Sequence, residues 1–317
     1  MTNSILLRFT DKEQRALHHI TLSSKPVIRW AGWSEDGQEA VLVGNNGLML
    51  VFQGDRFHEL ESQTREHLRC ASYNPMDSTI LAVGNRGRVI LMDKSRRARM
   101  LDSKTSSNLR RCSWSRDGSY AVIVGNDGAA LIWNGSSFTE VDGALNNLRS
   151  ITWDAEGSAF ISGNYFGASM TPSPTLYMLE FEAKRLESIA VTEKTDLISI
   201  DFGPEGQLLA GGYDLVWQEP RAFKWNGKTL ESVKIGESGV YLTSIAWQPG
   251  NKFALVGTGS PKLPGEGGGM MLGFTPKDAI SGKLFEDPEQ RIVCIAWRPQ
   301  GDYALIVGNR FAQTFST

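Results

Sequence analysis

One short pattern recurs seven times in this chain of 317 residues and constrains its fold more than any other feature. Each copy alternates apolar and polar residues and closes on an aromatic residue, which is typical of a β-strand. The copies are VIRWAGW (27–33), HLRCASY (67–73), NLRRCSW (108–114), NLRSITW (147–153), DLISIDF (196–202), YLTSIAW (241–247) and RIVCIAW (291–297). Successive closing aromatics are 39 to 50 residues apart, so every repeat is long enough for a unit of four strands.

The clearest copy of the whole repeat, residues 109–135, shows what each unit contains. Asp117-Gly118 follows the first strand and indicates a tight hairpin turn, because glycine tolerates the positive φ that such turns need. The run SYAVIVG that comes next is apolar enough for a strand buried on both faces. A turn at Asn126-Asp127-Gly128, the strand AALIW, a turn at Asn134-Gly135 and the more polar strand SFTEV complete the unit. The repeat therefore predicts four antiparallel strands joined by tight turns.

Seven such units predict an all-β fold, a seven-bladed β-propeller of four-stranded antiparallel blades that forms one domain over residues 1–317. The last copy supplies only three strands, and a three-stranded blade would leave a long unpaired edge. ALHHITL (16–22) lies just before the first strand of blade 1, where every other blade has its fourth strand. We therefore expect ALHHITL to be the outer strand of blade 7 and to close the ring. ILLRF (5–9) either adds a further strand beside it or replaces part of the third.

The repeats resemble those of divergent WD-repeat-like β-propellers over essentially the whole chain. The Gly-His and Trp-Asp dipeptides of true WD repeats are absent, so their His-Ser-Asp network is not expected here. The strand-turn segment VGNDGAALIW (124–133) is also similar to propellers of the photosystem II assembly-factor type. That resemblance implies a non-enzymatic chaperone.

Composition and charge narrow the function classes. The formal net charge of −2 argues against general nucleic-acid binding, which needs a basic face. No stretch approaches the ~20 apolar residues of a membrane span, and the first residues lack the features of a secretory signal, so we expect a cytoplasmic protein that does not enter the membrane.

Cys70, Cys112 and Cys294 each lie in a first strand and are expected to be buried core thiols. The four histidines have no metal-ligand spacing, and we expect no metal and no cofactor.

Arginine occupies the third position of four consecutive first strands, as Arg29, Arg69, Arg110 and Arg149. The same position in the other blades holds Ile198, Thr243 and Val293. In a propeller the first strand is innermost and begins at the face that carries the loops between blades, so the four guanidinium groups would form an arc at the channel mouth. An uncompensated arc favours carboxylate or phosphate groups. The alternative is that each arginine pairs with a nearby acid, such as Glu66 or Asp142, and only ties the blades together.

The connections between the second and third strands are long in blades 4 to 6, at 164–177, 213–223 and 258–271. They emerge on the same face as the arginine arc. Long loops in compact domains are commonly functional, and aromatic and methionine side chains are enriched at protein interfaces. We therefore expect a partner to contact the exposed residues Tyr165, Phe166, Trp217, Met270 and Met271. The alternative is that these side chains fold back and cap the blades.

These patterns favour a non-enzymatic scaffold or assembly factor that binds a protein partner or an acidic peptide through one propeller face. The alternative is a propeller enzyme, a lyase or hydrolase, that acts on an anionic small molecule held by the arginines. An enzyme would need an acid or a base beside them. Asp201 is the only carboxylate within the body of a first strand, and Tyr165 and Glu219 are candidates on the long loops. No catalytic residue is assigned from the sequence.

Overall fold

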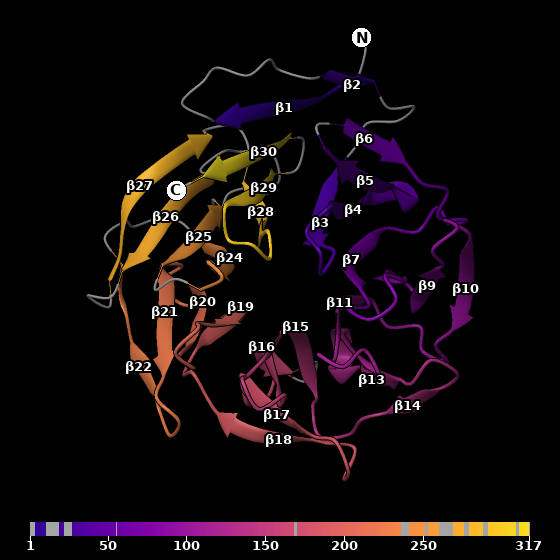
Figure 1. The fold of residues 1–317 in the computed structure, drawn as a ribbon. Helices are drawn as coiled ribbons and strands as arrows, with labels where there is room; N and C mark the ends of the chain where they lie inside the picture. The colour runs from indigo at the N-terminus through magenta and orange to yellow at the C-terminus, as the bar shows by residue number, and fades with distance from the viewer. Residues whose placement is uncertain are drawn as a thin grey trace.

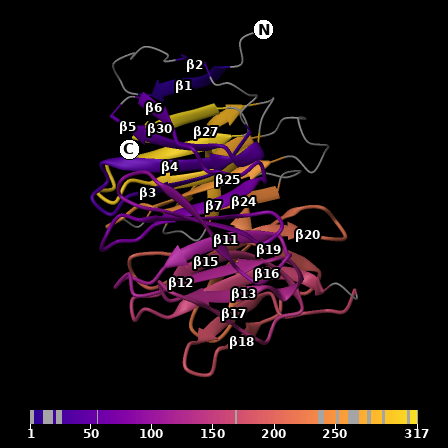
Figure 2. The same cartoon turned by 90° about the vertical axis from the view of Figure 1, so that its right-hand side faces the viewer.

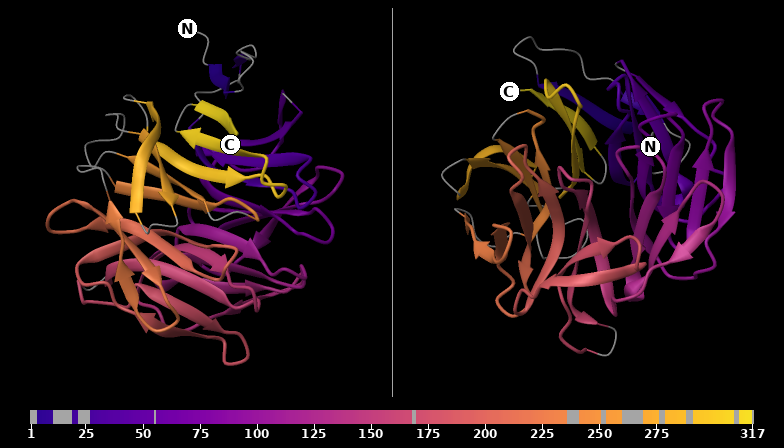
Figure 3. Two further views of the ribbon diagram at one scale, coloured as in Figure 1. Left: turned by 60° about the vertical axis from the view of Figure 1, so that its left-hand side comes forward. Right: turned by 60° about the horizontal axis from the view of Figure 1, so that its bottom comes forward.

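A computed structural model describes residues 4–10, 19–21, 27–54, 56–167, 170–235, 241–250, 253–259, 269–275, 279–287, 291–308 and 311–316. Within these ranges the regular structure is all β-strand apart from two 3-10 turns, η1 (Asn45–Gly47) and η2 (Asn126–Gly128). The strands form seven sheets that follow one another around a ring (Figure 1). Side views show the strands of successive blades lying side by side, with the connecting loops at two opposite faces (Figures 2 and 3). The seven-bladed β-propeller predicted from the repeat is confirmed.

Blades 1 to 3 each contain four antiparallel strands in sequential order. Blade 1 consists of β3 (Ile28–Trp33), β4 (Glu39–Gly44), β5 (Met49–Gln53) and β6 (Arg56–Glu59). Blade 2 consists of β7 (Leu68–Tyr73), β8 (Ile80–Gly84), β9 (Arg88–Met92) and β10 (Ala98–Asp102). Blade 3 consists of β11 (Leu109–Trp114), β12 (Ala121–Gly125), β13 (Ala130–Trp133) and β14 (Phe138–Glu140).

Blades 4 to 6 keep this order, and blade 6 has one strand more. Blade 4 consists of β15 (Asn146–Trp153), β16 (Ala159–Gly167), β17 (Leu176–Glu180) and β18 (Arg185–Ala190). Blade 5 consists of β19 (Thr195–Phe202), β20 (Leu208–Asp214), β21 (Pro220–Trp225) and β22 (Leu230–Ser232). Blade 6 consists of β24 (Tyr241–Trp247), β25 (Ala254–Gly259), β26 (Gly269–Thr275) and β27 (Ala279–Asp287). The short strand β23 (Lys234–Ile235), which leaves blade 5, pairs in parallel with β27 and joins the outer edges of the two blades.

Blade 7 is closed by the N-terminus, although not by the strand expected. It contains β28 (Ile292–Trp297), β29 (Tyr303–Gly308) and β30 (Phe311–Ser316), then β1 (Ser4–Thr10) and β2 (His19–Thr21). ILLRF lies within β1 and takes the fourth place, pairing with β30 from Leu6 opposite Phe311 to Thr10 opposite Phe315. ALHHITL was expected there, but its described part, β2, pairs only with β1 and is the fifth strand.

The pairing of β1 gives the physical reason. β1 pairs with five of the six residues of β30 and so covers most of an edge that would otherwise stay open, and β2 adds to the outer edge of β1. The closing pair is parallel, so blade 7 also departs from the all-antiparallel pattern.

The aromatic residues that end the inner strands pack between blades. The indole Nε1 of Trp297 donates to the carbonyl of Ala246 in blade 6 at 3.0 Å, and that of Trp33 donates to Ala296 in blade 7 at 2.9 Å. Trp153 makes the equivalent bond to Ser113 Oγ at 2.8 Å. In these blades the repeated aromatic therefore packs a large ring and also bonds the preceding blade, whereas the Nε1 of Trp114 is buried without a partner.

The three cysteines are buried free thiols within the blades, as predicted. Their Sγ atoms lie 3.3 to 3.4 Å from backbone carbonyl oxygens, for example Cys294 Sγ from Ala31 O. They act as small core residues.

Candidate functional site

The third residue of each of the seven aligned repeats is the extra residue of a β-bulge in the inner strand. The register between the first two strands shifts at this position in all seven blades, for example between Leu68 and Cys70, and so around Arg69. A bulge turns a side chain away from the regular alternation of the strand. The bulged side chains therefore meet at the channel mouth instead of packing between blades.

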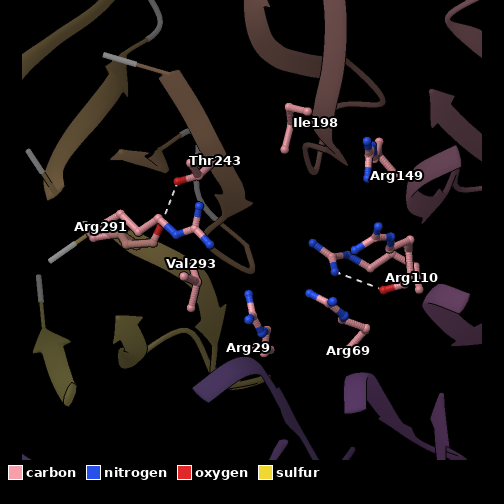
Figure 4. Close-up of a pocket in the computed structure, with 10 residues that line it drawn as sticks. Arg29, Arg69, Arg110, Arg149, Ile198, Thr243, Arg291 and Val293 are labelled. Atoms are coloured by element: carbon pink, nitrogen blue, oxygen red, sulfur yellow. Dashed lines mark hydrogen bonds between the residues drawn. The ribbon is translucent and has the colours of Figure 1, made fainter. Parts of the chain in front are cut away.

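The bulged residues of all seven blades line one cavity of about 210 Å³. Figure 4 shows the arginines of blades 1 to 4 around a common opening, with Ile198, Thr243 and Val293 on the remaining side. The predicted arc is thus present, and its side chains share one space. The cavity has a cationic side and a less polar side.

Each arginine of the arc is held by an asparagine of its own blade. The Nε atoms of Arg29, Arg69, Arg110 and Arg149 donate to the Oδ1 atoms of Asn45, Asn85, Asn126 and Asn164, at 2.7 to 2.9 Å. Each of these asparagines follows a glycine of the second strand, which is the last residue of the strand in blades 1 to 3. In blade 1 that glycine is required because a Cβ on Gly44 would lie 2.1 Å from the carbonyl oxygen of Val27. The repeated Gly-Asn pair therefore places the acceptor that fixes the arginine side chain.

The arc is not neutralised by the acids considered from the sequence. Glu66 pairs with the exposed Arg86 at 3.2 Å. The backbone of Asp142 bonds Lys184 and Leu186 at the start of the outer strand of blade 4. Among the described residues, none of the four arginines forms a salt bridge. Their terminal Nη atoms also have no protein hydrogen-bond acceptor within that part of the chain.

Two further arginines lie at the same cavity, and the sequence alignment did not find them. Arg291 stands two residues before the aligned position of blade 7. Arg111 stands one residue after it in blade 3, with its guanidinium carbon 4.1 Å from the centre of the Trp30 ring. The Nε atoms of both are buried without a hydrogen-bond partner. A buried donor without an acceptor is unfavourable, so these groups add to the unsatisfied positive charge.

Burial and mutual repulsion lower the pKa values of the arc. Burial, Arg29 and Arg110 lower the pKa of Arg69 to about 9, and burial, Arg149 and Arg111 lower that of Arg110 to about 10. The pKa values of Arg29, Arg149 and Arg291 are lowered as well, chiefly by burial. All of these groups are cationic at neutral pH, since the pKa of arginine starts above 12. An anion in the cavity would relieve this repulsion.

Hydrogen bonds between neighbouring blades also stabilise the channel mouth. Two residues before the arginine, a side chain accepts a backbone N–H from the turn of the preceding blade. His67 Nδ1 accepts from Asn46 at 3.1 Å, and Asn147 Oδ1 accepts from Asp127 at 3.0 Å. Both donors have a positive φ of 56°, which asparagine and aspartate adopt more readily than most residues. The arginines therefore stand on a fixed frame.

The five loop residues expected on this face have different surroundings. Trp217 is 72% exposed. Tyr165 and Phe166 are half-buried and pack edge-to-face, with ring centroids 4.8 Å apart. Met271 was expected to be exposed and is fully buried, because β26 begins earlier than the loop boundary suggested and draws it into the blade core. The side chain of Met270 and residues 260–268, which hold most of the GEGGG segment, lie outside the described residues.

Other exposed apolar side chains near these connections were not predicted. Leu145, Met170, Val191 and Val216 are 55% to 75% exposed. Met170 and Val216 lie on the long connections of blades 4 and 5, and Leu145 and Val191 lie on the loops that enter those two blades. The backbone N–H of Leu215 donates to the carbonyl of Lys194 at 2.8 Å and joins the connection of blade 5 to the loop that precedes this blade. With Trp217 these four side chains form what we call the apolar rim of blades 4 and 5.

The two carboxylate residues considered as acid–base candidates, Asp201 and Glu219, form hydrogen bonds within the fold and do not line the cavity. The Asp201 carboxylate accepts from Thr152 Oγ1 at 3.1 Å and from the Trp247 N–H at 2.8 Å, and so links blades 4, 5 and 6. It is not among the residues that line the cavity. Glu219 is an exposed loop residue whose carbonyl accepts from the Asp214 N–H.

The described residues contain no group of three or more histidine, cysteine or acidic residues that could hold a metal. They also include no helix of the length and apolarity that crossing a bilayer requires.

Fold and site together define a seven-bladed β-propeller with a cationic, asparagine-braced channel mouth. No protein-family model matches the chain, and no curated protein matches it in sequence. Among solved structures, the chain is similar to one described as YCF48 bound to D1 peptide, with a TM-score of 0.67 and 15% identity, covering 94% of each chain. This similarity agrees with the resemblance to photosystem II assembly-factor type propellers, and at such identity it shows the fold alone.

Proposed function

We propose that the protein is a non-enzymatic interaction scaffold that binds an acidic peptide or protein segment at the arginine-lined channel mouth. One observation carries the proposal: four arginines on consecutive blades are fixed at Nε by asparagines, and their Nη edges are free of protein acceptors in the described residues. Guanidinium groups held in this way are preorganised for anionic oxygen atoms.

The apolar rim of blades 4 and 5 supports a partner larger than a single ion. It consists of Leu145, Met170, Val191, Val216 and Trp217. Tryptophan is enriched among the residues that dominate binding energies at interfaces. The neighbour described as YCF48 was solved with a bound peptide, which is compatible with peptide binding by a propeller of this shape. We expect the anionic part of the partner to enter the mouth and an apolar part to contact the rim.

Binding of a fluorescein-labelled, glutamate-rich peptide tests the proposal. Arg69→Gln combined with Arg110→Gln should weaken binding at least tenfold, and added salt should weaken wild-type binding through screening. The matched control is Arg97→Gln combined with Arg116→Gln. It removes the same charge from exposed turns on the opposite face and should leave affinity unchanged. Equal losses in both double variants would show that only net charge matters and would contradict a specific site.

Trp217→Ala tests the rim separately. For peptides that carry apolar residues beside the acidic ones, it should lower affinity severalfold. Affinity for the purely acidic peptide should not change. A loss with both peptides, or with neither, would remove the rim from the proposal.

A further inference from the structure

The cavity holds more positive charge than one carboxylate neutralises. Six arginines line it, and the acids whose charges reach the arc are Asp127, which acts on Arg110, and Asp196, which acts on Arg149. The Asp196 carboxylate already accepts the Tyr165 N–H at 2.8 Å and the Tyr213 hydroxyl at 3.2 Å. A ligand that relieves the repulsion at Arg69 and Arg110 must therefore bring most of the negative charge itself.

The geometry also favours a tetrahedral anion. Because each Nε of the arc is committed to an asparagine, each guanidinium offers only its Nη edge to the cavity. A carboxylate has two oxygen atoms in one plane and suits one or two such edges. The three terminal oxygen atoms of a phosphate monoester can accept from several edges that approach from different directions. In Figure 4 the labelled arginines approach the opening from different sides, with Arg291 across from Arg110.

The residues of the cavity wall other than arginine, together with the cavity volume, limit the organic group that the anion can carry. Ile198, Thr243 and Val293 occupy the bulge positions of blades 5 to 7. The volume of about 210 Å³ is below the range of pockets that enclose drug-sized molecules. The space therefore suits a phosphate with a small, partly apolar group attached.

We infer that the channel mouth is a receptor for a phosphate monoester, carried either by a phosphorylated side chain of a partner or by a small free ester. The inference rests on the proposed function, because it narrows the anion that the same site accepts. The free Nη edges bind the phosphate oxygen atoms, and the wall of Ile198 and Val293 contacts the group that bears the phosphate.

Calorimetric titration with phenyl phosphate and benzoate in a phosphate-free buffer tests the inference. Phenyl phosphate should bind at least tenfold more tightly than benzoate. Arg69→Gln with Arg110→Gln should lower its affinity at least tenfold, and Arg97→Gln with Arg116→Gln should not. Arg69→Lys keeps the charge but loses both the planar fork and the bond to Asn85. It should also weaken binding at least tenfold, while the melting temperature falls by no more than about 4 °C, the shift that loss of the one bond to Asn85 accounts for.

The pH dependence gives an independent readout. The second ionisation of a phosphate monoester lies near pH 6, so lowering the pH from 7.5 to 5.5 should weaken its binding about fourfold. The other titratable groups around the arginines are His67, Glu66, Asp127, Asp196 and Tyr213. Protonation of any of them would make the mouth more positive and would strengthen anion binding. Weaker binding at pH 5.5 would therefore result from protonation of the phosphate and not of the protein. The affinity for benzoate should not fall over the same pH interval.

Three results separate the outcomes. A phosphoserine pentapeptide that binds more tightly than phenyl phosphate assigns the phosphate to a partner protein, and the reverse order assigns it to a free ester; both support the inference. Equal affinity for phenyl phosphate and benzoate overturns it, while binding of the glutamate-rich peptide keeps the proposed function. If the wild-type protein binds none of these anions, both the inference and the proposed function are overturned.

Discussion

At the aromatic end of the inner strands, four of the five tryptophans bond the preceding blade, and Trp114 is the exception, with a buried Nε1 that has no partner. Trp33, Trp153, Trp247 and Trp297 all donate an indole N–H to the first strand of the preceding blade. At the other end of these strands the arginines of neighbouring blades face one another without a salt-bridge partner among the described residues. There the guanidinium groups repel one another and leave donors unused. Natural sequences tolerate such local conflict mainly where function requires it. The comparison therefore separates the part of the repeat that stabilises the ring from the part that is available for binding.

The largest expected effect is at the aromatic end. Trp297→Ala removes a buried ring and its bond to Ala246, and should lower the free energy of unfolding by about 3–5 kcal/mol. Trp217→Ala is the matched control, because that ring is exposed, and should change stability by less than about 0.5 kcal/mol. Denaturant titration measures both, and similar losses would contradict the assigned packing.

Asp201 is the one charged residue at the aromatic end, and it should give a pH-dependent effect. Burial raises the pKa of its carboxyl to about 6 in the folded protein. The folded state thus holds the proton more tightly than the unfolded state, so stability falls as the pH rises from about 4 to 6. Asp201→Asn lacks this loss and should gain up to about 3 kcal/mol on the wild type over that interval, at 1.36 kcal/mol for each pKa unit. A difference between the two proteins that does not vary with pH would contradict the raised pKa.

A smaller effect is expected where an asparagine holds an arginine. Asn85→Ala removes the acceptor of the Arg69 Nε and should cost about 1 kcal/mol of stability. Because Arg69 is then free to move, affinity for acidic peptides should fall severalfold. If affinity is unchanged, the asparagines do not position the arginines, and the preorganisation argument is wrong.

Much of the fold and the position of the arginine arc could be predicted from the sequence, because the same strand pattern occurs in seven copies that can be aligned. The strand order, the buried cysteines and the position of the arc all follow from aligning the inner strands. The β-bulge at Arg69 and its equivalents could not be predicted, because a bulge depends on how two strands pair and not on one residue type. Arg291 was not predicted to line the cavity, because it lies two residues before the aligned position. The alignment does not show which residues next to that position also reach the cavity.

The N-terminus and the loops were predicted less well. Both ILLRF and ALHHITL are plausible strands, and which of them lies beside β30 depends on a pairing between the two ends of the chain that the repeat pattern does not show. Met271 was assigned to a loop because glycines precede it, yet it pairs with Phe285 inside blade 6. Pairing partners that are distant in sequence decide both cases.

The melting temperature of Arg69→Gln combined with Arg110→Gln, measured without ligand, tests the central claim most directly. This variant loses the bonds from Arg69 to Asn85 and from Arg110 to Asn126, each worth about 1 kcal/mol. The loss is offset because two mutually repelling, partly buried charges leave the cavity, and no buried acid loses its partner. We predict a melting temperature that is equal to that of the wild type within about 2 °C or higher, since 1 kcal/mol corresponds to about 2–4 °C in a domain of roughly this size. A variant that melts several degrees lower would show that the arginines hold the blades together, and would contradict a mouth left open for an anion.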